Sequence, residues 1–300
     1  MFASPDLPFA VAICTRGRPS LLAQTLDSLR AQPQRFPLLV VDQTSEADTA
    51  LRERARLWPQ LEVVRDAGTG LSRARNIAAR RLCADWIAYV DDDCLVEPDW
   101  AGTLAEEIER HPDAAMISGT IVAHARPAGR EFLPVSIWEV SQARLLRGPR
   151  VRPWEISFGV CFAVRRSAIE RLGGWDERLG PGNDRYPGAD DMDFNYRVLR
   201  AGEAAYVTPL VQVRHVHWRT PAQVVSLYEG YSRAWAGFSL KHLRTGDLRG
   251  GLRLWTLGVW DAYRMTGSAV RRRSRWRAAA ARAKWRGHLQ GTVLGLTERW

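Results

Sequence analysis

Cysteine is scarce in this 300-residue sequence, and the four cysteines lie far apart. They form no Cys-x-x-Cys pair, which argues against a zinc site and a disulfide framework and favours a reducing compartment. The N-terminus lacks a basic start followed by an apolar run, so we expect no secretory signal. No uninterrupted apolar run reaches about eighteen residues, and we therefore expect no membrane-spanning helix.

A dinucleotide fingerprint is also absent. No Gly-x-Gly-x-x-Gly follows the first apolar run, at residues 9–14. A dehydrogenase of the dinucleotide-binding type is therefore disfavoured. We find no internal repeat that would indicate a solenoid.

Charge is unevenly distributed along the chain. Residues 220–300 hold 15 Lys and Arg but only 4 Asp and Glu, a net charge of +11. Residues 1–219 carry a net charge of −1, so the basic excess of the whole chain belongs to its last quarter. A difference this sharp indicates two parts with different functions.

Strands and helices are predicted to alternate through the first 219 residues. Apolar runs that read as strands lie at 9–14, 38–41, 61–65, 86–90, 158–164, 204–207 and 210–215, and residues 115–122 read as a strand pair or bend. Helical patterns lie at 19–29, 48–58, 72–82, 99–111, 167–172 and 190–201, and Ser72 is the expected N-cap of the third. This alternation predicts an α/β fold with a mostly parallel, doubly wound sheet.

Three consecutive carboxylates, Asp91, Asp92 and Asp93, directly follow the strand predicted at 86–90. Open α/β sheets bind ligands at the carboxyl ends of their strands. Clustered acids repel one another and are costly to bury, whereas a hard divalent cation such as Mg²⁺ or Mn²⁺ offsets that cost. The acids therefore indicate a metal site, with a solvated acidic turn as the alternative.

Seven short motifs follow in order: Val41-Asp42, Gly70 to Asn76, Val90 to Asp93, Phe158 to Arg166, Gly173 to Glu177, Asp190 to Asp193, and His215 to His217. This series resembles glycosyltransferase family 2, whose members have the GT-A fold, a Rossmann-like α/β architecture. The resemblance covers about two-thirds of the chain and leaves the last 80 residues uncovered. It implies a catalytic domain at 1–219, with a nucleotide-sugar half at about 1–122 and an acceptor half at about 123–219.

The resemblance also implies a metal-binding role for Asp93, with help from Asp91, and a contact between Asp92 and the ribose of the donor. Either His215 or His217 would add a nitrogen ligand, and we favour His215. Imidazole beside carboxylates suits Mn²⁺ better than Ca²⁺. A histidine pair at the surface is the alternative.

The remaining donor-site residues implied by the resemblance bind or support the nucleotide; they are Thr15, Arg16, Asp42, Arg75 and Asn76. The sequence departs from the family at Gln43, where many members have Asp or Asn, and this leaves the base open. For Arg75 an equally good alternative is a place on an arginine-rich surface helix.

Asp191 is the candidate general base, within an Asp190-Asp191 pair where the family usually has Glu-Asp. A carboxylate at a helix N-terminus stays ionised, which favours a single displacement with inversion. Ordinary N-capping is the alternative.

Gly159, Trp175, Asp176 and Asp190 are the expected contacts to the acceptor or sugar, although Trp175 is as well explained as a core residue. The segment 124–154 lacks periodicity and is the candidate for acceptor recognition.

Residues 220–300 form the predicted helical extension, with breaks near 245–247, 250–251 and 267–268. Spacing puts Leu252 and Tyr263 on one helix face. Tryptophans amid arginines suit an anionic membrane surface, since indole lies at the headgroup level. The favoured interpretation combines membrane binding with a helical lid over the catalytic domain, a homodimer interface is the second, and nucleic-acid binding is the least favoured.

Together these features predict an inverting hexosyl- or deoxyhexosyltransferase that uses Mn²⁺ or Mg²⁺ and a UDP- or dTDP-sugar. The expected acceptor is a saccharide or lipid-linked saccharide of cell-surface polysaccharide synthesis. We expect the enzyme in the cytoplasm, peripheral to the inner face of the plasma membrane. The alternatives are a sugar-nucleotide pyrophosphorylase, for which the turn at 15–19 is too short and lacks lysine, and a non-catalytic basic protein that binds membrane or nucleic acid.

Overall fold

The structure is a computed structural model that describes residues 7–46, 48–124, 133–216 and 218–300. The described residues divide into two units. One is drawn from residues 1–125, 136–176 and 191–217, and the other from residues 126–135, 177–190 and 218–300.

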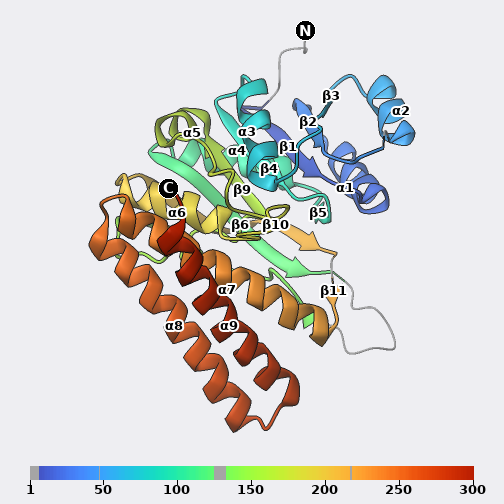
Figure 1. Cartoon of the computed structure of the whole chain (residues 1–300). Helices are drawn as coiled ribbons and strands as arrows, with labels where there is room; N and C mark the ends of the chain where they lie inside the picture. The colour runs from blue at the N-terminus through green and yellow to red at the C-terminus, as the bar shows by residue number, and fades with distance from the viewer. Residues whose placement is uncertain (1–6, 47, 125–132, 217) are drawn as a thin grey trace. The chain divides into compact units, whose positions relative to one another are not determined.

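The first unit is built on a mixed sheet (Figure 1). Its strands are β1 Phe9–Thr15, β2 Leu38–Asp42, β3 Leu61–Arg65, β4 Trp86–Val90, β5 Cys94–Val96, β6 Ala114–Ala123, β8 Arg144–Arg147, β9 Cys161–Arg165 and β10 Ala204–His215. Their order is β3-β2-β1-β4-β9-β6-β10-β5, with β8 also paired to β10. The four strands at one edge are parallel, whereas β9 runs antiparallel to both β4 and β6. The predicted α/β class is confirmed, with antiparallel pairs that periodicity did not reveal.

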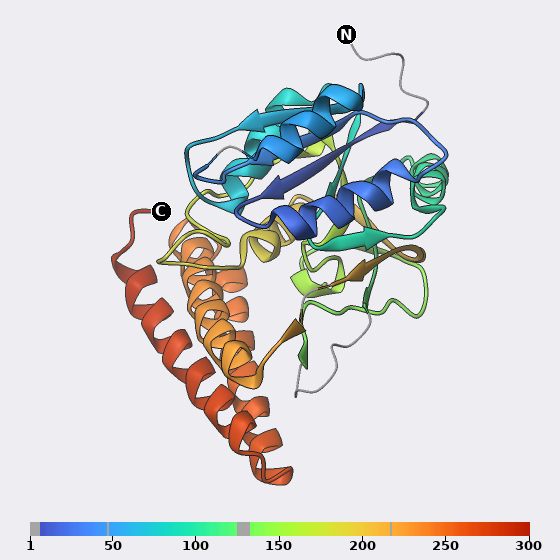
Figure 2. The ribbon, with the colours of Figure 1, turned by 90° about the vertical axis from the view of Figure 1, so that its right-hand side faces the viewer.

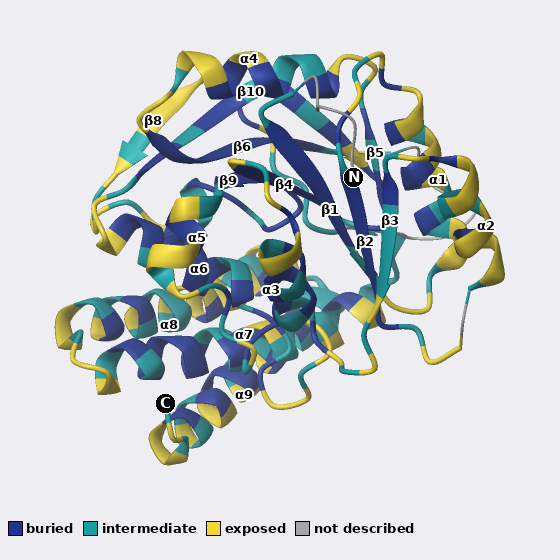
Figure 3. Cartoon of the chain, turned by 90° about the horizontal axis from the view of Figure 1, so that it is seen from above, coloured by how far each residue is buried: buried dark blue, intermediate teal, exposed yellow. Residues whose placement is uncertain are grey.

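Helices cover both faces of this sheet (Figure 2). They are α1 Pro19–Arg30, α2 Thr49–Leu57, α3 Leu71–Arg81, α4 Trp100–Arg110, α5 Arg166–Leu172 and α6 Asp190–Arg200. Because side chains alternate along a strand, Val11 faces one core with α1, α2 and α4, and Ala12 faces another with α3, α5 and α6. The central strands between these layers are buried, whereas β3 and β8 are partly exposed and the outer helix faces are exposed (Figure 3).

Some element boundaries differ from those predicted. Ser72 lies inside α3, whose N-cap is Gly70 with φ +123°, a conformation that glycine adopts without strain. The strand expected from residue 158 begins at Cys161, since Gly159 also has a positive φ. Residues 115–122 belong to one strand, β6, instead of a strand pair or bend.

The two short strands predicted at 204–215 are one continuous strand, β10. It pairs in parallel with β6, and the register shifts between Val207 and Gln212, which marks a β-bulge or similar irregularity. Beyond that shift, β10 also pairs antiparallel with β5, where His215 lies opposite Cys94. The unpatterned segment 124–154 contains β8 and the start of a 3₁₀ turn at Pro153–Glu155, while residues 125–132 lie outside the described part.

The second unit contains three long helices, α7 Pro221–Arg244, α8 Leu248–Arg271 and α9 Arg275–Thr297, which pack side by side (Figures 1 and 2). A short ladder joins β7 Leu133–Pro134 to β11 Trp218–Arg219. No described helix is both long enough and apolar enough to span a lipid bilayer.

Only one of the three helix breaks predicted in this unit is present, at Thr245–Asp247. The pairs at 250–251 and 267–268 lie inside α8, which ends instead before Arg273, a residue with φ +45°. Gly251 serves packing, because a Cβ there would lie 2.4 Å from the backbone nitrogen of Leu243 on α7.

Candidate active site

The three acids form the turn between β4 and β5. The N–H of Cys94 donates to the Asp91 carbonyl at 3.2 Å, so the chain reverses within these residues. Asp92 and Asp93 are buried, and Asp91 is half-buried. A solvated acidic turn, the alternative left open by the sequence, does not describe this arrangement.

Asp92 is held by the last residue of β1 and by a residue of the loop that follows it. The Thr15 hydroxyl donates to Asp92 Oδ2 at 2.7 Å, and Arg18 Nη1 lies 3.2 Å from Oδ1. Burial raises the pKa of Asp92, while Arg18 and the Thr15 hydroxyl act in the opposite direction. Arg18 was missed by the sequence analysis, which placed the neighbouring Arg16 in the site; Arg16 is exposed.

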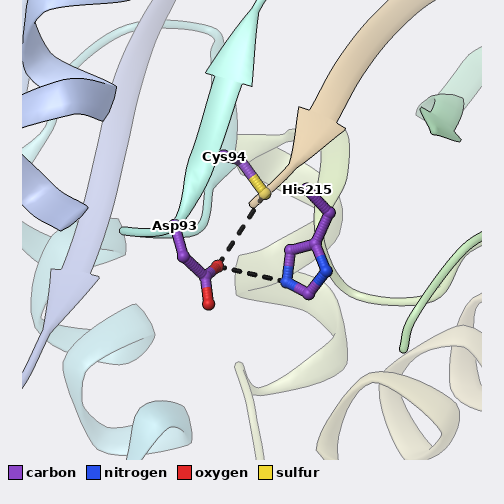
Figure 4. A group of neighbouring side chains, drawn as sticks. All are labelled: Asp93, Cys94 and His215. Atoms are coloured by element: carbon purple, nitrogen blue, oxygen red, sulfur yellow. Dashed lines mark hydrogen bonds and ion pairs between the residues drawn. The ribbon is translucent and has the colours of Figure 1, made fainter. Parts of the chain in front are cut away.

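Asp93 contacts three side chains. His215 Nε2 lies 3.3 Å from Asp93 Oδ1, and the Cys94 thiol donates to the same oxygen at 3.9 Å (Figure 4). Arg18 Nη1 lies 3.0 Å from Asp93 Oδ2. The Val216 N–H donates to the Asp93 carbonyl at 2.9 Å, which ties the end of β10 to the acidic turn. His217 lies outside the described residues.

A divalent cation fits this group of donors. One ligand atom each from Asp93, Cys94 and His215 lie within 4.8 Å of one another, and all three residues are buried. Burial, with the nearby acids adding to it, raises the pKa of the Cys94 thiol well above its usual value, so we expect sulfur to remain protonated. The remaining carboxylate and imidazole suit Mn²⁺ or Mg²⁺.

Arg75 connects Asp91 to Gly159, which lies just before β9. It is buried, its Nη2 donates to the Gly159 carbonyl at 2.6 Å, and the same atom lies 3.7 Å from Asp91 Oδ1. Burial raises the pKa of Asp91 to about 7, and Arg75 opposes that shift. The alternative of a surface arginine is therefore wrong for Arg75.

Gly159 in turn contacts Asp191. It has φ +73°, and a Cβ built on it would lie 2.9 Å from Asp191 Oδ2. Asp191 is half-buried in the first turn of α6, where its Oδ1 accepts from the Met192 N–H at 2.8 Å. Asp191, Gly159, Arg75 and Asp91 thus form one continuous series of neighbours, which connects the candidate base to the acidic turn.

The residues at the end of β2 form a turn that is hydrogen-bonded to the start of α3. Asp42 is buried and accepts from the Thr44 N–H at 2.9 Å. Gln43, where the sequence departs from the family, accepts from the Gly70 N–H at 3.0 Å and donates to the Gly70 carbonyl at 3.2 Å. Gln43 therefore fixes the start of α3, the helix that carries Arg75.

Asn76 and Trp175 have structural roles here. The Asn76 amide donates to the Trp175 carbonyl at 2.9 Å and accepts from its N–H at 2.8 Å. The Trp175 ring is buried and stacks on Phe194 with centroids 4.4 Å apart. Trp175 is thus a core residue, and its predicted contact with a sugar is corrected because Phe194 covers its ring face.

Asp176 and Asp190 are the last two predicted site residues. Asp176 is half-buried directly after Trp175. Asp190 is buried at the start of α6, where a Cβ on Gly180 would lie 2.9 Å from its Cγ.

Comparison with known proteins gives relatives over most of the chain. It is 25% identical over 236 residues to the glucosyl-dolichyl phosphate glucuronosyltransferase of Haloferax volcanii, covering 75% of each protein. It is 28% identical over 250 residues to the succinoglycan biosynthesis protein ExoM of Rhizobium meliloti, covering 81% of this chain and 74% of that protein.

Solved structures agree in fold. The mannosyltransferase PcManGT from Pyrobaculum calidifontis, in complex with GDP-Man and Mn²⁺, has a TM-score of 0.62 at 18% identity, covering 99% of this chain and 90% of that one. GalNAc-T7 with UDP, GalNAc and Mn²⁺ has a TM-score of 0.56 at 20% identity, and the match covers 78% of this chain and 48% of that one. These similarities confirm the predicted GT-A fold.

The family model described as Glycosyl transferase family 2 matches residues 10–173. This range includes β1 to β9 and the acidic turn. Because the match spans more than half of the chain, this protein belongs to glycosyltransferase family 2 and is a glycosyltransferase.

Proposed function

We propose that the protein is an inverting glycosyltransferase that moves a sugar from a UDP- or dTDP-sugar to a hydroxyl of a saccharide or lipid-linked saccharide. The observation that carries the proposal is the series of contacts from Asp191 through Gly159 and Arg75 to Asp91. A carboxylate at one end and an acidic, cation-compatible turn at the other are what direct displacement requires.

The donor would lie over the acidic turn. Asp93 and His215, assisted by Asp91, would hold Mn²⁺ or Mg²⁺, which when bound neutralises the charge of the leaving diphosphate. Asp92 would accept from the ribose hydroxyls, and Asp42 would contact the base or ribose. Solved structures of this fold contain GDP-Man with Mn²⁺ and UDP with Mn²⁺, which supports a nucleotide and a divalent metal at this place.

Loop residues would complete the nucleotide site. Thr15 holds Asp92 in place, and Arg16 is exposed on the same loop, where it can reach a ligand. Arg75 and Asn76 would support the site through the backbone that they bind, as their contacts to Gly159 and Trp175 indicate.

Asp191 would remove the proton from the acceptor hydroxyl. Its position in the first turn of α6 favours the anion, because the free N–H groups and the helix dipole stabilise negative charge there. A base on the side opposite to the departing diphosphate gives one displacement with inversion at the anomeric carbon. Asp176 and Asp190 remain our candidates for orienting the acceptor.

A lipid-linked acceptor would place the enzyme at the inner face of the plasma membrane, with residues 220–300 as the membrane-facing part. One relative is named for action on a glucosyl-dolichyl phosphate and another for succinoglycan biosynthesis, which supports an acceptor of cell-surface polysaccharide synthesis. A homodimer interface is the alternative role that we propose for residues 220–300. The relatives named above favour transfer over the pyrophosphorylase alternative.

A nucleotide-sugar panel tests the proposal. Thermal unfolding would be followed with UDP-, dTDP- and GDP-sugars, each with Mn²⁺ and with a chelator, since a bound ligand stabilises the folded state. We expect stabilisation by a UDP- or dTDP-sugar that depends on Mn²⁺, and release of the nucleotide when acceptor is added. Stabilisation by a GDP-sugar alone would contradict the donor assignment, and equal effects with chelator would contradict the metal.

A further inference from the structure

The outer face of α8 carries an unusual row of exposed apolar side chains. Leu252, Tyr263 and Val270 are 55%, 61% and 74% exposed. Their spacings of eleven and seven residues are close to three and two helical turns, so the three side chains lie along one line. Trp260, also exposed, stacks on Tyr263 with ring centroids 5.6 Å apart.

A row of arginines runs beside this apolar row. Arg253, Arg264 and Arg271 each follow one residue after a member of the apolar row, so they keep the same spacing along the helix. The sole acid in the sequence of α8 is Asp261, which pairs with Lys284 of α9. The outer face of α8 therefore combines aromatic, aliphatic and cationic groups without a compensating row of acids.

A groove of about 720 Å³ lies along the C-terminal half of this face. Tyr263 and Val270 line it together with the cationic side chains of Arg264, Arg271 and Arg277 and with Asp261, whose carboxylate pairs with Lys284. Arg277 Nη1 donates to the Ser268 hydroxyl at 3.0 Å, which holds one guanidinium in position beside the groove. The groove has the size and charge to receive a phosphate with attached apolar chains.

The chemistry of this face distinguishes between partners. Exposed aliphatic side chains such as Val270 gain nothing from a phosphodiester backbone, which argues against a nucleic acid. A second copy docked through the same face in two-fold symmetry would bring equivalent arginine rows together, and like charges oppose such contact. An anionic bilayer matches both rows, because aromatic and aliphatic groups enter the interface while arginines meet phosphates.

We propose that the outer face of α8 is a docking surface for an anionic phospholipid bilayer, with a lipid phosphate in the groove near Arg264 and Arg271. This inference deepens the proposed function, because it names the surface that would bring the enzyme to a lipid-linked acceptor. It predicts that the full chain binds vesicles without donor or metal. The outcome of this test is therefore independent of whether the transfer reaction takes place.

Vesicle flotation of the full chain tests the proposal, with neutral phosphatidylcholine vesicles and with vesicles that also contain phosphatidylglycerol. We expect flotation with the anionic vesicles alone. Arg264→Gln with Arg271→Gln should weaken partitioning by about 30-fold, since each basic residue near the surface contributes about fivefold. The matched control is Arg35→Gln with Arg52→Gln, two exposed arginines of the first unit, which changes net charge equally.

The apolar row is tested by Tyr263→Ser with Val270→Ser. The control is Leu57→Ser with Leu210→Ser, which removes two similarly exposed apolar side chains elsewhere. The first pair should lose flotation at raised salt, and the control pair should keep it. Circular dichroism would verify that all four variants are folded.

Several outcomes would overturn the proposal. These are equal flotation with neutral and anionic vesicles, no flotation, or equal losses in the test and control variants. Retention of a nucleic-acid duplex in place of the vesicles, or a doubled mass in light scattering without flotation, would assign the face to those partners instead.

Discussion

The Cβ position of Gly159 lies 2.9 Å from the carboxylate oxygen Oδ2 of Asp191. The same glycine accepts the Arg75 hydrogen bond through its carbonyl. A residue without a side chain therefore sets the distance between the candidate base and the buried arginine that neighbours the acidic turn.

Gly159→Ala should lower turnover by about 100-fold with little change in donor affinity, because the added methyl group displaces Asp191 and small misplacements of a reacting group are costly. Steady-state kinetics and calorimetry with the donor would measure the two effects. Gly202→Ala is the matched control, since Gly202 has φ +75° and no atom near its Cβ position. Equal loss of turnover in both variants would show that backbone strain alone is responsible.

Asp191→Asn should retain binding of donor and metal but reduce transfer by a factor of about 10² to 10⁴, the usual contribution of a general base. Asparagine keeps an oxygen that can accept from the Met192 N–H, so the helix start should be preserved. Calorimetry and a transfer assay check the two properties. If donor affinity fell together with transfer, Asp191 would be a structural residue.

Asp93→Ala should abolish the strengthening of nucleotide binding by Mn²⁺, because it removes the carboxylate that lies beside His215. Cys94→Ala is the matched control in the same turn, and we expect it to keep the metal effect because Mn²⁺ prefers carboxylate ligands to sulfur. Nucleotide affinity would be titrated with and without Mn²⁺ for each variant. An unchanged metal effect in Asp93→Ala is incompatible with its role as a ligand.

His288 makes the stability of the helical unit depend on pH. It is buried, and neither ring nitrogen has a hydrogen-bond partner within the described residues. Burial lowers the pKa of His288 to about 4. The folded state thus binds fewer protons than the unfolded state between pH 6.5 and 4, so stability is full above that range and falls by about 3 kcal/mol across it.

Denaturant unfolding followed by helical circular dichroism, at several pH values, would measure that loss. His288→Leu should flatten the pH dependence in this range, because leucine fills the same apolar site without titrating. A variant that loses stability as steeply as the parent on acidification would exclude His288 as the cause.

The acidic turn and the order of the motifs were visible in the sequence, since each polar residue follows an apolar strand. Arg18 was not, because its contact with Asp92 depends on β1 and β4 being neighbours in the sheet, and neighbouring strands cannot be read from periodicity. The sequence likewise showed only that Gln43 departs from the family and leaves the base open, whereas its amide binds Gly70, 27 positions away in the sequence.

The helical extension shows why hydropathy alone misplaces a helix face. The buried positions of α8 are small or aliphatic and include Gly251, Leu254, Ala262 and Ala269, whereas the larger Leu252 and Tyr263 are exposed. Close packing of helices favours small residues at the contact, so the most apolar face need not be the inner one.

The register shift in β10 has a consequence at its far end. Side chains alternate sides along a strand, so slipping one position past β5 would exchange His215 for its neighbour Arg214 and turn the imidazole away from Asp93. The length of the short stretch from Thr208 to Val211 therefore sets which side chain of β10 faces Asp93. One residue more or fewer there would keep every candidate ligand in the sequence but turn the imidazole away from the acidic turn.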